Sequence, residues 1–180
     1  MPDAEERTIG VAVAIPDPYG PELQSRRAAL GDPLATSIPA HITLVPPTRV
    51  PVPALDDIDR HLRGVALGER PFHIHLRGTG TFRPVSPVVF VALAEGIGDC
   101  ERLEYEIRRG PLAVERPFPY HPHVTVAHHL PDDLLDQAFK ELAGYEAEFP
   151  VDGFWLYEHG LDGVWRPRWH FPFGDHAYRS

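Results

Sequence analysis

The chain has 180 residues, enough for one domain with a sizeable core, and its 43% hydrophobic and 24% charged content is ordinary for a globular protein. Its net charge of −9 argues against a broad basic face that coats nucleic acid, although a local phosphate pocket is compatible with it. The start lacks a signal-peptide pattern, no apolar run approaches the roughly 18 residues of a membrane span, and one cysteine cannot form an internal disulfide, so we expect a cytoplasmic protein.

Seven stretches have the apolar or alternating character of β-strands. In chain order they cover residues 8–15, 40–45, 72–82, 88–93, 123–128, 151–159 and 164–171. Between them, apolar residues at helical spacing predict three helices, and a weaker helix is expected over residues 21–30. The residues with this spacing are Leu55, Ile58, Leu62 and Val65; Ile97, Cys100, Leu103 and Ile107; and Leu134, Leu135, Ala138, Phe139 and Leu142. No long linker interrupts the series, so residues 1–180 are predicted to form one domain.

The order of these elements occurs twice. Strand, helix, strand, helix and strand follow one another over residues 8–82 and again over residues 88–159, which divides the chain into lobes of approximately residues 8–83 and 87–172. The middle strand of each half begins alike, with "HITL" at residue 41 and "HVTV" at residue 123. We therefore expect an α+β fold of two lobes related by a pseudo-twofold axis, with helices flanking antiparallel sheets and the two His-x-Thr strands facing a central cleft.

The repeated His-x-Thr triplet indicates a particular chemistry. Alternate side chains of a strand share a face, so His41 and Thr43 point one way, as do His123 and Thr125. Two imidazoles on one cleft can act as general base and general acid, because the ordinary pKa of histidine is about 6.5. Threonine hydroxyls can donate hydrogen bonds to phosphate oxygens. The set suits hydrolysis of a phosphodiester without a metal or any other cofactor.

These motifs resemble those of the 2H phosphoesterase superfamily, and within it the bacterial 2′-5′ RNA ligase-like proteins, also described as RNA 2′,3′-cyclic phosphodiesterases. The resemblance extends over "AHITLVPPTRV", "RGTGTFRPVSPVVFVAL", "FPYHPHVTVAHH" and "LDGVWRPRWHFPFG". It implies hydrolysis of a 2′,3′-cyclic phosphate end of RNA, or of a cyclic nucleotide, to a 2′-phosphomonoester. Any RNA joining is expected to be the weak reverse reaction, without ATP, and we expect a monomer.

The catalytic histidine of the second motif must be chosen between His121 and His123. Only His123 has a threonine two residues later, and only His123 follows a proline as it does in the family. The resemblance also implies that His123 activates water and that His41 protonates the leaving oxygen.

Substrate-binding residues are less well marked by the sequence. Phe82 and Tyr120 are predicted to stack on a base, His121 to line the cleft and Arg83 to supply positive charge. Many relatives carry an arginine shortly after the second His-x-Thr, where this chain has His128 and His129.

Two other functions compete with this interpretation. The "HIH" at residues 73–75, with the histidines at 121–129, could belong to a metal-dependent hydrolase, although the nearby Asp132 and Asp133 are expected to cap a helix. The lobes could also bind a nucleotide or an RNA end without turning it over. Two complete His-Thr pairs argue against pure binding, because binding alone needs no proton donor and acceptor together.

Overall fold

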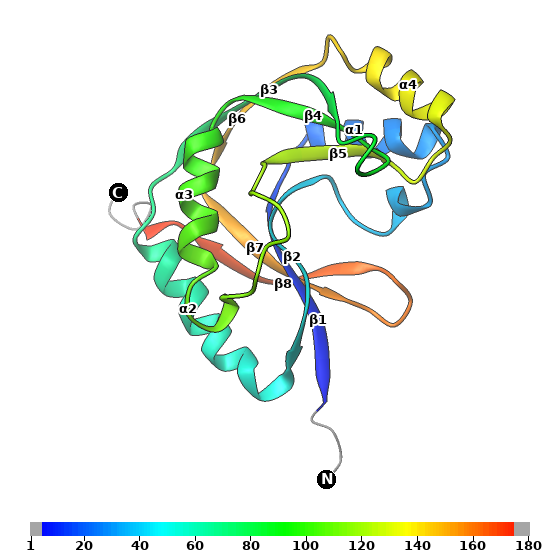
Figure 1. Cartoon of the computed structure of the whole chain (residues 1–180). Helices are drawn as coiled ribbons and strands as arrows, with labels where there is room; N and C mark the ends of the chain where they lie inside the picture. The colour runs from blue at the N-terminus through cyan, green and yellow to red at the C-terminus, as the bar shows by residue number, and fades with distance from the viewer. Residues whose placement is uncertain (1–4, 175–180) are drawn as a thin grey trace.

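Two four-stranded antiparallel sheets curl around the middle of the molecule, and four helices cover them (Figure 1). The computed structural model describes residues 5–174. The strands are β1 (Glu6–Ala14), β2 (His41–Pro51), β3 (Phe72–Thr81), β4 (Val88–Glu95), β5 (His123–His128), β6 (Glu146–Val151), β7 (Gly153–His159) and β8 (Trp165–Pro172). The helices are α1 (Tyr19–Ala29), α2 (Leu55–Leu67), α3 (Ile97–Ile107) and α4 (Asp132–Glu141), with short 3-10 turns at Pro33–Thr36, Val52–Ala54 and Gly110–Leu112.

The predicted α+β fold with two related lobes is confirmed by the order of the strands. The first sheet runs β2-β1-β7-β8 and the second β5-β4-β3-β6, so β2 and β5 hold the same edge position. In each sheet an antiparallel pair, β1–β2 or β4–β5, is joined through a helix. Each of these helices packs against the other sheet: α1 packs against β5 of the second sheet, and α3 packs against β2 of the first.

The division of the sequence near residues 83–87 does not coincide with the division between the sheets. β3 comes from the first half of the chain but lies in the second sheet, and β7 and β8 come from the second half but lie in the first. The predicted strand 151–159 is in fact two strands, because β6 ends at Val151 and β7 begins at Gly153 in the other sheet. Each sheet is therefore built from both halves.

Proline-containing segments account for the other differences from the predicted strands. β2 continues to Pro51, beyond the predicted end at residue 45, and β6 was not predicted over 146–150. Both strands lie at sheet edges, where proline is tolerated because its missing N–H can be on the side that has no neighbouring strand.

One continuous cluster of buried apolar side chains joins the sheets and helices. The predicted helical stripes supply much of it, including the fully buried Ile58, Leu62, Leu103 and Ile107. Cys100 is buried on the same stripe of α3, as expected for a core residue, and burial raises the pKa of its thiol to about 12.

A buried ion pair ties the first half of the chain to β5. Arg27 Nε donates to Asp32 Oδ2 at 2.7 Å, with side-chain exposures of 7% and 0%. The same carboxylate oxygen accepts from the backbone N–H of His128 at 3.0 Å, and Oδ1 accepts from Leu34 N at 2.9 Å. Asp32 therefore fixes the end of α1, the turn after it and the end of β5 together.

Replacing Asp32 with alanine should lower the free energy of unfolding by about 3–5 kcal/mol, because it leaves the buried Arg27 charge without its partner. Chemical denaturation of both proteins measures the loss. Asp57→Ala is the matched control, because its ion pair with Arg60 is exposed and should contribute little. Equal losses in the two variants would contradict the assigned role of Asp32.

Candidate active site

The two His-x-Thr motifs lie on edge strands that contact each other. β2 carries His41 and Thr43, and β5 carries His123 and Thr125. The residues between and after them, Ile42 and Leu44 on β2 and Val124 and Val126 on β5, are fully buried. This burial fixes which face each strand turns to the core, so the imidazoles and hydroxyls lie on the opposite face.

The two histidines make the same local hydrogen bond. His41 Nδ1 lies 2.8 Å from the carbonyl oxygen of Pro39, and His123 Nδ1 lies 2.7 Å from that of His121. Because a carbonyl oxygen can only accept, Nδ1 carries a hydrogen in both rings. Nε2 is therefore the nitrogen that remains for a ligand, and each ring is held in the tautomer that can accept a proton there.

Burial lowers the pKa of both catalytic candidates. The pKa of His123 falls to about 4 because burial disfavours the imidazolium, and the charges of His121 and His41 lower it further. The pKa of His41 is also lowered, first by burial and then by Arg27, while its bond to Pro39 opposes the shift. The effect of His41 on His123 shows that the two rings are electrostatically coupled.

A cavity of about 640 Å³ opens beside these strands. Thr43, His123 and Thr125 line it, and Thr43 also lines an adjoining hollow of about 100 Å³ that contains His41. Thr43 lines both spaces, so the two parts of the predicted cleft adjoin at this residue. Within the described chain no acidic residue lines the larger cavity, although the sequence has 26 acidic and 17 basic residues. Its electrostatics favour an anion.

The aromatic residues at the cavity pack around the second histidine. The Phe82 ring centroid lies 4.9 Å from that of His123 and 5.5 Å from that of His121, edge to face in both cases. Phe90 lies 5.2 Å from His123, and Gly80 leaves room for its ring, since a Cβ there would come within 2.4 Å of it. Phe82 and His121 thus lie at the cavity wall, and their use in substrate binding stays a prediction.

Tyr120 and Arg83 lie differently from their predicted use. Tyr120 lines the cavity, but its hydroxyl donates to the carbonyl of Thr43 at 2.8 Å, and burial raises its pKa. It therefore joins the segment before β5 to β2. Arg83 does not line the cavity, because its guanidinium donates to Thr81 and to Asp136 of α4. The ion pair with Asp136 therefore holds the Arg83 charge beside α4.

Two arginines that the sequence reasoning missed contribute charge to the cavity. Arg108 is at the end of α3 and Arg116 is in the segment that leads to β5. No local pattern distinguishes Arg108 from its neighbour Arg109, and only the fold shows which of them faces inward. Phe118 and Val85, 65% and 75% exposed, form an apolar rim at the same opening.

The histidines of the competing metal hypothesis are spread over different surfaces. His73 and His75 lie on β3 beside β6, with Nε2 atoms 3.3 Å from Glu148 and Glu146, respectively. His128 and His129 stack on each other at 3.7 Å. Within residues 5–174, no three His, Cys, Asp or Glu side chains are placed to hold a metal ion.

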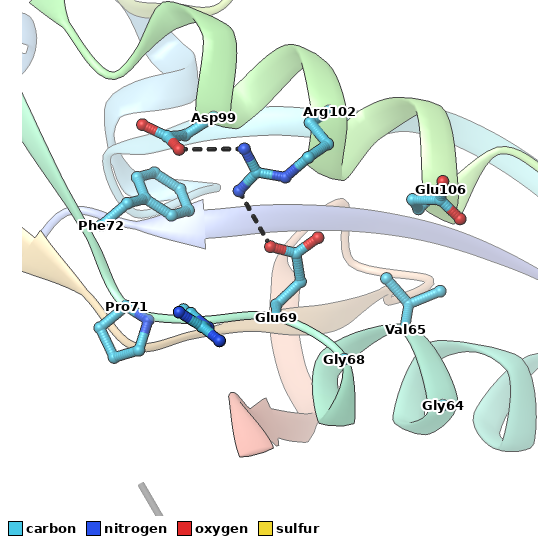
Figure 2. Close-up of a pocket in the computed structure, with 10 residues that line it drawn as sticks. Gly64, Val65, Gly68, Glu69, Pro71, Phe72, Asp99, Arg102 and Glu106 are labelled. Carbon is cyan, nitrogen blue, oxygen red and sulfur yellow. Dashed lines mark hydrogen bonds and ion pairs between the residues drawn. The ribbon is translucent and has the colours of Figure 1, made fainter. Parts of the chain in front are cut away.

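A second hollow of about 650 Å³ lies between the end of α2 and α3 (Figure 2). There Arg102 bridges Glu69 at 3.1 Å and Asp99 at 3.2 Å, and Glu106 lies on the same side. Each of its three carboxylates is paired with an arginine, Glu106 with Arg109, and neither His-x-Thr motif lines this hollow. Separately, none of the described helices is both long and apolar enough to cross a bilayer.

Comparisons with known proteins agree with these features. Residues 15–163 match the family model of the 2′-5′ RNA ligase superfamily. A protein of Bacillus cytotoxicus named "Putative phosphoesterase" is 30% identical over 79% of this chain and 84% of its own length. A protein of Bacillus cereus strain AH820 with the same description is 29% identical over 74% of this chain and 78% of its own.

Solved structures share the fold over nearly the whole chain. TT0787 of Thermus thermophilus is 26% identical, with a TM-score of 0.67 over 93% of this chain and 98% of that one. LigT of E. coli, crystallised with 3′-AMP, is 17% identical, with a TM-score of 0.63 over 94% of this chain and 99% of that one. LigT has also been crystallised with phosphate and with ATP.

Sulfate should bind this protein more tightly as the pH falls. Both imidazoles are held neutral near pH 7 by their lowered pKa values, and a bound dianion stabilises the imidazolium, so the complex takes up protons. The affinity should rise from about pH 7 downward and level off near the free pKa of His123, about 4. Calorimetry in buffers of different ionisation enthalpy measures the uptake.

His123→Gln should reduce both the proton uptake and the pH dependence. Sulfate suits this measurement because its own charge is constant over the range. Binding that is independent of pH, or unchanged in His123→Gln, would show that the anion does not meet this histidine.

Proposed function

The chain belongs to the 2′-5′ RNA ligase superfamily of 2H phosphoesterases, and we propose that it is a metal-independent phosphodiesterase that hydrolyses 2′,3′-cyclic phosphate ends of RNA or nucleotides to 2′-phosphomonoesters. The observation that carries the proposal is the matched pair of Nδ1 hydrogen bonds, which leaves one Nε2 of each motif for the substrate. The fold shared with a protein that has been crystallised with 3′-AMP supports a nucleotide substrate.

The reaction is an in-line displacement at phosphorus. His123 Nε2 takes a proton from water as the water oxygen bonds to phosphorus, and the bond from phosphorus to the ribose O3′ breaks. His41, present as the imidazolium, gives its Nε2 proton to O3′, which leaves a 3′-hydroxyl and a 2′-phosphate. A second molecule's 5′-hydroxyl in place of water would form a 2′-5′ phosphodiester by the same in-line displacement, with O3′ again the leaving oxygen, and this weak joining reaction would use no ATP.

The roles differ between histidines although the local bonding is the same. The Nδ1–H bond to a carbonyl favours the imidazolium in both rings, whereas burial disfavours it. The negative phosphodiester can offset the burial for one proton, and coupling between the rings disfavours a second. One neutral and one protonated imidazole is the state that catalysis needs, and we assign the neutral one to His123.

The threonines have hydroxyls on the same face as the imidazoles. Thr43 lines both parts of the cleft and Thr125 lines the larger part, which supports a role for both as donors to the non-bridging oxygens. Charge builds on these oxygens as water attacks, and a donor fixed in advance stabilises that charge. We expect the loss of either hydroxyl to lower the rate by a factor of about 10–10³.

Turnover of a 2′,3′-cyclic nucleotide in excess EDTA tests the reaction class. The purified protein should hydrolyse it to the 2′-phosphate, and His41→Ala or His123→Ala should each cost about 10²–10⁴ in rate. Hydrolysis that EDTA abolishes would instead favour a metal-dependent hydrolase. Tight binding without turnover would favour a nucleotide-binding protein. His129→Ala is a control on the adjoining surface, and robust ATP-dependent ligation would also count against the proposal.

The assignment of acid and base is tested with a phosphodiester that carries a good leaving group. A nitrophenyl ester needs little protonation of its leaving oxygen, so it should rescue His41→Ala far more than His123→Ala. The measured quantity is the ratio of kcat/KM on the nitrophenyl ester to that on the cyclic phosphate. Greater rescue of His123→Ala would reverse the assignment. The double variant should be little slower than either single one, because the residues act as a unit.

A further inference from the structure

A charged cluster beside the cavity has more positive than negative charge. Glu104 of α3 is 2% exposed, and both of its oxygens accept from Arg116 Nη1, at 2.7 and 3.0 Å. One helical turn later, Arg108 Nε lies 3.7 Å from the same carboxylate. Two guanidinium groups therefore share one carboxylate, which leaves the cluster with one excess positive charge.

The two arginines retain hydrogen-bond donors without a partner in the described part of the chain. The Arg108 side chain is only 8% exposed, and its buried Nε makes no hydrogen bond there, while Nη2 donates to the carbonyls of Val114 and Glu115. Among the described residues, the hydrogen bonds of Arg116 use only Nη1, and 41% of its side chain is exposed. Arg108 Nε lies against Glu104 and is inaccessible, so the donors left for a ligand are Arg108 Nη1 and Arg116 Nε and Nη2, for which the described residues provide no hydrogen-bond acceptor. Charged donors without an acceptor favour binding of an anion.

Both arginines line the same cavity as His123 and Thr125, and the volume exceeds what one phosphate fills. About 640 Å³ is within the range of sites for small organic ligands. The apolar rim of Phe118 and Val85 lies on that cavity too, which suits the ribose or base that separates two phosphates. The cavity thus combines one anion position at the His-x-Thr motifs with a second at the arginines.

We propose that Arg108 and Arg116 bind a second anionic group of the substrate, the 5′-linked phosphate of the nucleotide whose 3′ side carries the reacting phosphate. This second anion site rests on the proposed function and narrows it, because the preferred ligand becomes a nucleotide with a phosphate on both the 5′ and the 3′ side of its ribose. Arginine suits this role, since its planar fork matches phosphate oxygens. The competing structural role, in which the cluster only ties the segment before β5 to α3, predicts no such preference.

Equilibrium binding of three nucleotides separates the two anion positions. The probes are 3′-AMP, 5′-AMP and adenosine 3′,5′-bisphosphate. The wild-type protein should bind the bisphosphate at least about tenfold more tightly than 3′-AMP, as expected for charge-assisted hydrogen bonds to one added phosphate. A 3′-phosphorylated adenosine dinucleotide then distinguishes two sources of the second anionic group. If it also binds more tightly than 3′-AMP by a similar factor, the group is an internal RNA phosphodiester. If it does not, the group is a terminal 5′-phosphate.

Arg116→Gln should remove most of this preference, and Arg116→Lys should keep part of it because the charge remains. Arg116 is the position to change because it is half-exposed, so a glutamine there disturbs the core less than a change at Arg108. Arg109→Gln is the matched control, since Arg109 pairs with Glu106 and does not line the cavity. The readout is the ratio of the dissociation constants for 3′-AMP and the bisphosphate, from which any general change in affinity cancels.

Each outcome decides the proposal. Equal affinities for 3′-AMP and the bisphosphate in the wild type would overturn it and leave the proposed reaction intact. A ratio unchanged in Arg116→Gln would assign the cluster a structural role only. Binding of 5′-AMP that depends on Arg116, without binding of 3′-AMP, would support the subsite and contradict the proposed function. Failure of all three nucleotides to bind would overturn both.

Discussion

The alternation of side chains along β2 and β5 is the constraint on which the site depends. Ile42 and Leu44, like Val124 and Val126, are fully buried and fix the inward face of each strand. A slip of one residue would bury the imidazoles and expose the core side chains, so the packing that stabilises the fold also orients the face that bears the His-x-Thr side chains. The short bonds to Pro39 and His121 then set the tautomer of each ring.

Neither half of the chain can form this cleft alone. Each sheet contains strands from both halves, and α1 and α3 each pack on the strand that bears the opposite motif. Asp32 and Tyr120 add polar links of the same kind: the first reaches the end of β5, and the second reaches the backbone of β2 beside Thr43. The two motifs are thus held to one another by core packing and by hydrogen bonds that cross between the sheets.

The sequence predicts the parts of this protein that follow from periodicity and repetition. The His-x-Thr strands, the helical stripes and the duplicated order were visible because each is a local pattern, and the fold and family agree with them. The strand exchange was not predictable, since periodicity says nothing about which sheet receives β3 or β7. Side-chain direction was also hidden: Arg83, predicted to face the substrate, is held by Asp136, while Arg108 and Arg116 reach the cavity through the path of α3 and the following segment. The roles of the paired histidines and threonines remain predictions.

The distribution of proline over the sheets has a consequence for how copies of this chain meet. In the described part of the chain the two sheets have four outer strands, β2, β8, β5 and β6. Three of these strands contain prolines: Pro46 in β2, Pro150 in β6 and Pro167 in β8 are examples. The fourth outer strand, β5, contacts β2. A strand edge with missing N–H donors is a poor template for a strand from another molecule. The prolines in these edge strands therefore disfavour edge-to-edge pairing between copies of the chain.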